Sequence, residues 1–176
     1  MAKTDEQDSL RERLICAGIE EIAAHGLNGF SLRRVAAACQ VSCAAPYRHF
    51  SNREDFIRAT VAYINSQWGL LRDNIMRLYR DDPRRQLTEL CLAYIRFLVA
   101  NHNYRSVLVA SGEQWDEDER IAALLSLCTE GEGAEEQARR LYAIRALIYG
   151  TVAMLESGEL PNNDASFAMI RKTIEI

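Results

Sequence analysis

Side chains that can bind phosphate groups are concentrated between residues 31 and 53. Every charged side chain of this segment is an arginine, namely Arg33, Arg34, Arg48 and Arg53. The segment contains no acidic residue, although the whole chain has a net charge of −4. Because salt screens charges that lie more than about 8 Å away, the local charge decides which partner a surface attracts. We therefore expect this segment to contact phosphate groups in spite of the acidic chain around it.

The residues around these arginines predict two short helices joined by a turn. Ser31 is a suitable N-cap for a helix that extends to about Cys39, and Gln40-Val41 would form the turn. Ser42 would then cap a very short third helix that ends near Phe50. Two short helices joined by a turn, with a longer helix before them, are typical of a helix-turn-helix unit. Such a unit places its second short helix in the major groove of DNA.

The predicted third helix has an anchored side and an exposed side. Its spacing predicts that the anchors are Val41, Tyr47 and Phe50. The side left for a major groove would carry Cys43, Ala44 and Arg48. Small residues near the start of such a helix let its backbone approach the base edges and contact thymine methyl groups.

Pro46 interrupts the pattern of this third helix. It lacks the N–H group that would donate to the carbonyl of Ser42, and its ring biases Ala45 away from helical angles. We therefore expect the first turn of the helix to be distorted or tightened.

The rest of the chain predicts α-helices. It shows long apolar patterns with a period of about 3.6 residues and no alternating run of β-branched residues. We predict a first helix over about residues 8–24 with Gly26 as its stop, and a long fourth helix to about residue 79 that begins at a capping box of Ser51 and Glu54. Further helices are predicted at about residues 84–100, 104–110, 120–129, 135–156 and 164–176. The fold class is therefore all-α, with an N-terminal three-helix unit over residues 8–53 and a larger helical domain over residues 54–176.

Short motifs follow one another in a characteristic order between residues 15 and 56. An Ala-x-x-Gly-x-x-x-x-Ser pattern comes first, formed by Ala23, Gly26 and Ser31. The motifs after it are Val35-Ala36, Val41-Ser42, Tyr47-Arg48-His49-Phe50 and Asn52-Arg53-Glu54. In this order they resemble the helix-turn-helix DNA-binding domain of the TetR family of bacterial transcription regulators. The remainder of the chain resembles the family in outline, as a helical ligand-binding and dimerisation domain.

The resemblance implies roles for individual residues. Tyr47 and His49 resemble the family's phosphate-binding pair, and Arg53 resembles its basic residue at the start of the fourth helix. The phosphate contacts at the second helix would be Ser31 and Arg33. The recognition-helix positions that read bases, or adjoin those that do, would be Ser42, Cys43, Ala44, Ala45 and Arg48.

Each of these residues also has an alternative interpretation. Tyr47 could be a core residue, and His49 could be a surface residue that titrates near neutral pH. Arg34 is more consistent with a solvated side chain than with a DNA contact. Cys43, at a helix N-terminus, could be a redox-sensitive thiol, since that position lowers the pKa of a thiol.

The resemblance further implies a small-molecule effector and a second copy of the chain. The effector cavity would lie among the later helices, and its candidate residues, each of which could instead be ordinary core, are Tyr63, Trp68, Tyr94, Phe97, Tyr104 and Trp115. The two-fold dimer would form through the last two helices, with an apolar face of Leu141, Ile144, Leu147, Ile148, Val152 and Leu155. We expect a homodimer that binds double-stranded palindromic operator DNA, represses transcription and is released by the effector.

Several other classes of protein find little support. The histidines at positions 25, 49 and 102 are scattered, and no cluster of acid, base and nucleophile suggests an enzyme. Five cysteines without a C-x-x-C pair argue against a zinc site or a disulfide framework, and we expect no metal or cofactor. No stretch approaches the roughly 20 apolar residues that span a bilayer, and the first residues are polar, so we expect a cytoplasmic protein without a membrane partner.

One alternative from another functional class stays open. The chain could be a helical ligand sensor or interaction module that has lost DNA binding. The basic segment 31–53 argues against this alternative. Binding assays at varied salt would separate the two, because binding to operator DNA must weaken steeply as salt is added.

Overall fold

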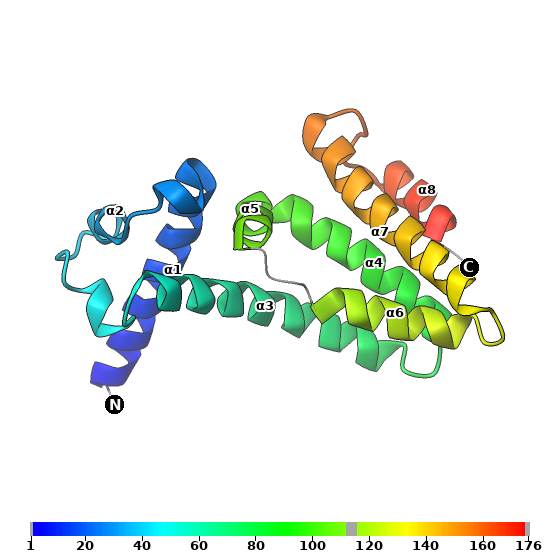
Figure 1. The fold of residues 1–176 in the computed structure, drawn as a ribbon, viewed down its shortest axis with the longest axis horizontal. Helices are drawn as coiled ribbons and strands as arrows, with labels where there is room; N and C mark the ends of the chain where they lie inside the picture. Colours follow the sequence, from blue (N-terminus) through cyan, green and yellow to red (C-terminus); the bar gives the residue numbers. More distant parts are fainter. Residues whose placement is uncertain (1, 112–115, 175–176) are drawn as a thin grey trace. The chain divides into compact units, whose positions relative to one another are not determined.

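The prediction of an all-α fold is confirmed. The computed structural model describes residues 2–111 and 116–174, and within these residues it contains helices and no strand. Its α-helices, labelled in Figure 1, are α1 (Ala2–Gly29), α2 (Leu32–Ala38), α3 (Arg53–Leu78), α4 (Pro83–Ala100), α5 (His102–Ser111), α6 (Asp116–Cys128), α7 (Ala134–Ser157) and α8 (Asp164–Ile174), and a short 3-10 helix, η1 (Pro46–Arg48), lies between α2 and α3. Most predicted helices therefore occur, and the predicted third helix does not.

By its internal contacts the chain divides into two compact units. The first unit contains α1, α2, η1, α5 and the part of α3 that ends at Gln67. The second contains α3 from Trp68 onward together with α4, α6, α7 and α8. The sequence suggests a different division, between residues 53 and 54, which separates a DNA-binding unit from a ligand-binding and dimerisation domain. That division stays a prediction.

The first unit is built on one apolar face of α1. The buried residues of this face are Leu14, Ile15, Ile19 and Ile22. Gly18 lies on the same face, and a Cβ atom there would come within 2.3 Å of the ring of Phe56. Phe56 is fully buried, with ring centroids 4.6 Å from Phe50 and 5.3 Å from Phe30. The missing side chain at Gly18 is therefore what lets α3 pack against α1.

Gly26 ends the regular part of α1, as the sequence predicts. Its backbone angles (φ 67°, ψ 170°) are not helical, although helical structure resumes and continues to Gly29. Positive φ is easily adopted only by a residue without a Cβ atom. Gly26 thus sets the direction in which the chain approaches α2.

The N-terminal cap of α3 uses different residues from those predicted. The helix begins at Arg53, so Asn52 is the capping residue, and its Oδ1 accepts a hydrogen bond of 2.8 Å from the Asp55 N–H. Asp55 Oδ2 in turn accepts a bond of 2.8 Å from the Ser51 N–H, which lowers the pKa of the Asp55 carboxyl. The predicted capping box of Ser51 and Glu54 was wrong by one position, because both residue pairs have side chains that suit a box and the sequence does not fix the first helical residue.

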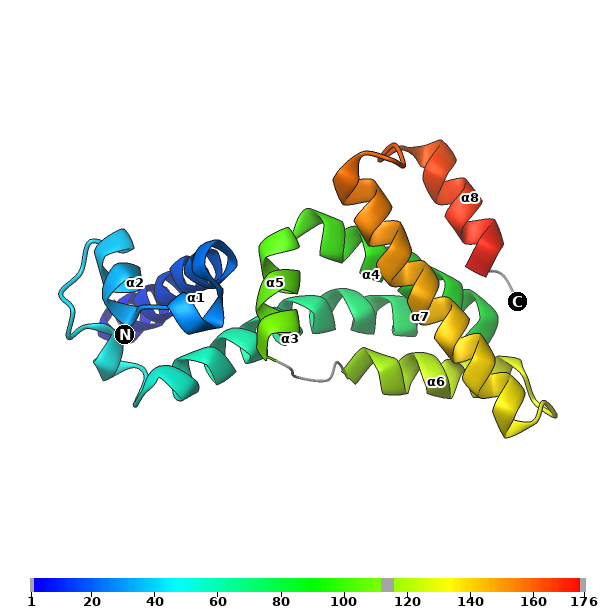
Figure 2. The ribbon, with the colours of Figure 1, turned by 45° about the horizontal axis from the view of Figure 1, so that its top comes forward.

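The second unit has a single apolar core in which α7 crosses α4 and α6 (Figure 2). Trp68 lies at its centre, with ring centroids 5.0 Å from Tyr94 and 5.4 Å from Phe97. Four of the residues predicted to form the dimer face are buried in this core, namely Ile144, Ile148, Val152 and Leu155. Leu141 and Leu147 are partly buried against the same core. The prediction of this face was wrong, because a helical apolar stripe does not reveal which element covers it.

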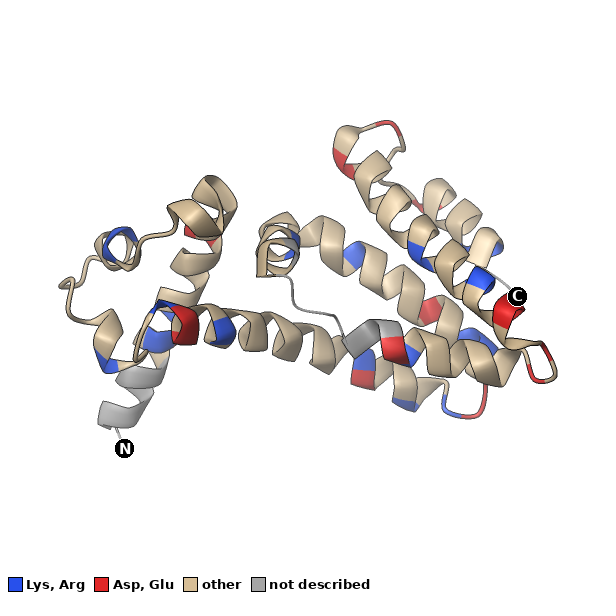
Figure 3. Ribbon diagram, in the orientation of Figure 1, with Lys and Arg blue, Asp and Glu red and all other residues tan. Residues whose placement is uncertain are grey.

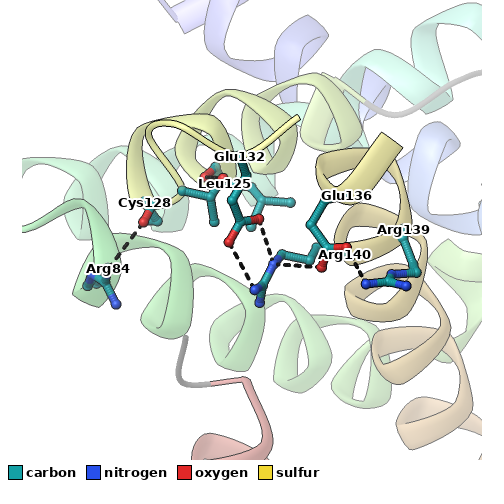
Figure 4. A network of polar contacts seen from close by, with 8 residues as sticks. Arg84, Leu125, Cys128, Glu132, Glu136, Arg139 and Arg140 are labelled. Atoms are coloured by element: carbon teal, nitrogen blue, oxygen red, sulfur yellow. Dashed lines mark hydrogen bonds and ion pairs between the residues drawn. The ribbon is translucent and has the colours of Figure 1, made fainter. Parts of the chain in front are cut away.

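Polar contacts hold the loop between α6 and α7 (Figure 4). The guanidinium of Arg140 donates two hydrogen bonds to the Glu132 carboxylate, at 2.8 and 3.0 Å. Arg84, from the start of α4, donates to the carbonyl of Cys128 at the end of α6. These bonds fix the turn that brings α7 back across the core.

Candidate nucleic-acid interface

The helix α2 is capped as predicted, and its two neighbouring arginines differ in their contacts within the fold. Ser31 has extended backbone angles, and its Oγ accepts a bond from the Arg34 N–H at 3.5 Å. The side chain of Arg34 donates to the Glu21 carboxylate and to the Gly29 carbonyl, and the bond with Glu21 raises the pKa of the guanidinium. Arg33 is exposed and has no ion pair among the described residues. Of the two, Arg33 is therefore the one left for an external anion.

The turn after α2 is a Schellman motif at an unusual residue. The Val41 N–H donates to the Ala36 carbonyl and the Gln40 N–H to the Ala37 carbonyl, each at 3.0 Å. Gln40 has a φ of 58°, the left-handed conformation that glycine usually supplies at this position. The turn directs the chain sharply from α2 into the next segment, as a helix-turn-helix unit requires.

The segment after this turn is not an α-helix, which corrects the prediction of a third helix from Ser42 to near Phe50. The Ala45 N–H donates to the Ser42 carbonyl at 2.9 Å, and the His49 N–H donates to the Pro46 carbonyl at 3.0 Å. These bonds span three residues, as in a 3-10 helix. Pro46 has no N–H to make the four-residue bond to Ser42, so Ala45 takes that carbonyl instead.

Pro46 does not displace the residue before it. Ala45 has helical angles (φ −61°, ψ −44°), so the expectation that it would leave the helical region was wrong. Proline is well tolerated at the first position of a helix, where its missing N–H costs nothing. The tightening of the first turn, by contrast, is confirmed.

The side chains of this segment divide into buried and exposed sets. Ala45, Pro46 and Phe50 are buried against the first unit. Tyr47 is 60% exposed, so its predicted role as an anchor was wrong, and its ring is available to an external partner. The other exposed residues of the segment are Ser42, Cys43, Ala44 and Arg48, while His49 is partly buried.

Arg53 has partners within the first unit. Its guanidinium donates to the carbonyl of Leu27 and lies 5.9 Å from the ring centroid of Phe30. Two of the segment's four arginines, Arg34 and Arg53, are thus engaged by the fold, and Arg33 and Arg48 remain exposed. Figure 3 shows that α2 and the loop after it carry basic and no acidic positions. The exposed charge of this surface is positive, although smaller than the sequence suggests.

A family match decides the identity of this unit. Residues 14–60 match the model of the "bacterial regulatory proteins, tetR family". Residues 14–60 are therefore a DNA-binding domain of the TetR family. Proteins with this domain regulate transcription by binding DNA. The matched residues include the whole segment from Ser31 to Arg53 described above.

Solved structures share the fold over nearly the whole chain. A "putative fatty acid metabolism regulator" from Clostridium perfringens is 15% identical and has a TM-score of 0.71, with 93% of this chain and 96% of that chain covered. A putative TetR-family regulator from Rhodococcus sp. is 20% identical with a TM-score of 0.64, covering 93% and 95%. A TetR variant from Acinetobacter baumannii AYE in complex with minocycline is 19% identical with a TM-score of 0.57, covering 92% and 90%. No curated protein matches the sequence.

The aromatic residues predicted to line an effector pocket lie in different surroundings. Trp68 and Tyr94 are buried in the core of the second unit and Phe97 is partly buried against it. Trp115 lies outside the described residues. Two cavities of the second unit, of about 350 and 270 Å³, are lined by other residues. The pocket role of these aromatic residues stays a prediction.

Tyr63 and Tyr104 belong to a polar cluster in the first unit that the sequence did not reveal. The hydroxyl of Tyr63 donates to Glu12 Oε1 at 3.2 Å and accepts from the Cys16 thiol at 3.9 Å. Burial, followed by the bond with Cys16, raises the pKa of Tyr63. Tyr104 shares a side-chain hydrogen bond with Tyr63. The residues of the cluster belong to α1, α3 and α5, and their separation in sequence gives no periodic signal.

Within the part of the chain that the structure describes, no group of three or more histidine, cysteine or acidic side chains could hold a metal ion. The helices found there are all too short or too polar to cross a bilayer. Cys43 is exposed, and its redox sensitivity stays a prediction.

Proposed function

We propose that the chain is a ligand-responsive repressor that binds a palindromic operator as a homodimer and is released by a small molecule. The observation that carries this proposal is that Arg33, Tyr47 and Arg48 are all exposed on segment 31–53, which has no acidic residue. Guanidinium and hydroxyl groups are the usual donors to phosphate oxygens. The repressor would act in the cytoplasm, where its operator is accessible.

Roles within this surface follow from exposure. Tyr47 of η1 and Arg33 of α2, which are both exposed, would bind phosphates, and the small exposed residues Cys43 and Ala44 would face base edges. Arg48 is the residue of this segment whose side chain can bind a guanine bidentately. Ser31, whose Oγ caps α2, and Arg53, which is bound to Leu27, would contribute mainly by holding the surface in place.

The dimer would form on the exposed side of α7 together with α8. Tyr142 is 74% exposed, and Tyr149 and Met154 on α7 and Met169 on α8 are also exposed large apolar residues. A Cβ atom at Gly150, on the same helix, would meet nothing within 4 Å, which leaves room for a close approach. An obligate dimer of this kind buries roughly 2,000 Å² or more. These residues replace the buried ones that the apolar stripe suggested.

Release by a ligand requires coupling between the two units. The helix α3 runs without interruption from Arg53 at the DNA-binding segment to Leu78 in the second unit. The related structure from Acinetobacter baumannii was obtained with minocycline, which supports a small-molecule effector for a chain of this fold. An effector that lowers operator affinity about 100-fold must favour the non-binding state by about 2.7 kcal/mol, within the usual range of allosteric coupling.

Selection of binding sites from random duplex DNA tests this proposal. The purified protein should enrich one sequence with two-fold symmetry, whose half-sites lie about one helical turn apart or slightly more. The enriched duplex should bind at least 10³-fold more tightly than random DNA. Enrichment of no sequence, with weak and uniform DNA binding, would support the alternative of a sensor that has lost its operator.

A further inference from the structure

A groove on the second unit lies between α3, α4 and α8, and Trp68 is not among its lining residues. It has a volume of about 270 Å³. Its apolar wall is formed by α3 and α4, with Ile75 and Leu92 buried and Leu71 partly exposed. Leu78, at the end of α3, is 74% exposed at the rim of this groove. Leu71 is 41% exposed, so the two leucines together give the groove an exposed apolar surface of the kind that marks ligand-binding grooves.

The groove is also lined by charged residues of α4 and α8. Arg171 of α8 donates two hydrogen bonds to the Glu89 carboxylate of α4, at 2.7 and 3.0 Å. Arg96 also lines the groove, and its guanidinium lies 4.3 Å from the ring centroid of Phe167, which fixes its position. The bonds from Arg171, and then the charges of Arg171, Arg85 and Arg96, lower the pKa of Glu89. One carboxylate therefore faces several guanidinium groups, and the charged lining of the groove is net positive.

We propose that this groove is the effector site of the repressor and that it binds an apolar monocarboxylate, which replaces Glu89 on Arg171. The inference rests on the proposed function and names the chemical class of its ligand. Glu89 already occupies the position that a ligand carboxylate would take, since a guanidinium fork binds a carboxylate through two parallel bonds. The hydrocarbon part of the ligand would lie against Leu71 and Leu78.

The alternatives to such a ligand fit the groove less well. A cationic ligand would meet Arg96 and Arg171 beside one ionised carboxylate that is already paired. A polyanion such as a nucleotide would leave the leucine wall without an apolar partner. The volume of about 270 Å³ lies just below the usual range of ligand pockets, roughly 300–1,000 Å³, so a short hydrocarbon chain fits better than a large ring system.

Titration calorimetry of the purified protein with sodium octanoate, sodium butyrate and octyltrimethylammonium tests this proposal. Octanoate should bind with a saturable isotherm. Butyrate should bind much more weakly, by about fourfold for each CH₂ group no longer buried. Octyltrimethylammonium, which has the same hydrocarbon chain and the opposite charge, should show no saturable binding. Absence of saturable octanoate binding, or equal binding of the cation, would overturn the proposal.

Four variants locate the binding in the groove. Arg171→Met should weaken octanoate binding about 10-fold or more, and Leu78→Asn should also weaken it while leaving the fold intact, because Leu78 is exposed. Glu89→Gln should tighten it, since the competing carboxylate is gone. Leu127→Asn, at an exposed leucine of α6 outside the groove, is the matched control and should bind octanoate like the wild type. Octanoate affinity that is unchanged in Leu78→Asn and Glu89→Gln would overturn the proposal.

Operator binding separates failure of this inference from failure of the proposed function. If the ligand-free wild type binds its selected duplex and octanoate binds elsewhere, only the groove is wrong. If the wild type selects no sequence, the repressor function itself is wrong. A groove that is the effector site predicts in addition that saturating octanoate weakens operator binding and that Arg171→Met abolishes this response.

Discussion

The two units of this chain differ in the kind of side chain that their surfaces leave exposed. In the first unit, Arg34 and Arg53 are bound by other groups of the unit, and the exposed Arg33 and Arg48 remain on a surface without acidic residues. In the second unit, Arg171 forms an ion pair with Glu89, and Arg140 forms one with Glu132. What remains exposed there are large apolar residues, among them Leu78, Tyr142 and Tyr149.

This difference indicates which partner each unit is built to meet. An exposed positive surface gains energy from a polyanion, whose counterions are released on binding. Exposed apolar side chains gain energy only when another apolar surface or an apolar ligand covers them. The first unit should therefore respond strongly to salt, and the second to substitutions that add charge to its apolar surface.

The largest expected effect is loss of the dimer when charge is placed on the exposed side of α7. The double variant Tyr142→Arg, Tyr149→Arg should weaken dimerisation at least about 100-fold, because two pairs of like charges would have to be desolvated in a symmetric interface. Sedimentation equilibrium at micromolar concentration measures this directly. Leu127→Arg, which adds a charge at an exposed apolar position on α6, is the control and should stay dimeric. A double variant that remains a dimer would mean that another surface forms the interface.

A substitution in the core of the first unit should cost slightly less. Gly18→Ala places a Cβ atom within 2.3 Å of the Phe56 ring, and overpacking of this kind costs about 1–3 kcal/mol. Thermal unfolding followed by circular dichroism measures the loss. Gly69→Ala, in α3, is the matched control, because its new Cβ atom would meet only the Arg72 guanidinium at 3.5 Å. Equal stability of the two variants would show that α1 and α3 pack less closely than described.

Substitutions in the recognition segment should divide by role. Arg48→Ala should change which operator is preferred, by about 1–3 kcal/mol for the lost base contact. Tyr47→Phe and His49→Ala should instead weaken binding to all sequences about equally, since phosphate contacts do not read sequence directly. Repeating the binding-site selection with each variant measures both effects. A Tyr47→Phe variant with a new base preference would contradict the assignment.

The smallest expected effect concerns the turn after α2. Gln40 adopts a φ of 58°, and Gln40→Gly should stabilise the chain by about 0.5–1 kcal/mol, because the left-handed conformation is strained for a residue with a Cβ atom. Denaturant midpoints of the two proteins give the difference. A destabilised glycine variant would mean that the glutamine side chain makes a contact worth more than the strain.

Features encoded by a few neighbouring residues could be predicted from the sequence. The cap at Ser31, the stop at Gly26 and the tightened turn at Pro46 each depend on the chemistry of one residue and its immediate neighbours. The start of α3 was predicted one position early, since Ser51 with Glu54 and Asn52 with Asp55 offer equivalent caps.

Features that depend on distant residues could not be predicted. The apolar stripe of Ile148 and Val152 was clear, but only the packed structure shows that α4 and α6 cover it and that Tyr149 faces outward. The pairing of Arg34 with Glu21, and of Arg171 with Glu89 across 82 residues, likewise has no periodic signature. The charge of segment 31–53 was therefore overestimated from the sequence, and the groove beside Arg171 was missed.

The central claim is that the exposed arginines of the first unit bind DNA phosphates, and the salt dependence of operator affinity tests it most directly. The slope of log affinity against log salt falls by about 0.9 for each phosphate contact removed from duplex DNA. Arg33→Gln should reduce the slope by about 2 in a dimer, one contact for each protomer. The double variant Arg34→Gln, Glu21→Gln, which removes an internal ion pair without changing the net charge, should leave the slope as in the wild type. A slope that is unchanged in Arg33→Gln, or that falls as much in the double variant, would contradict the account.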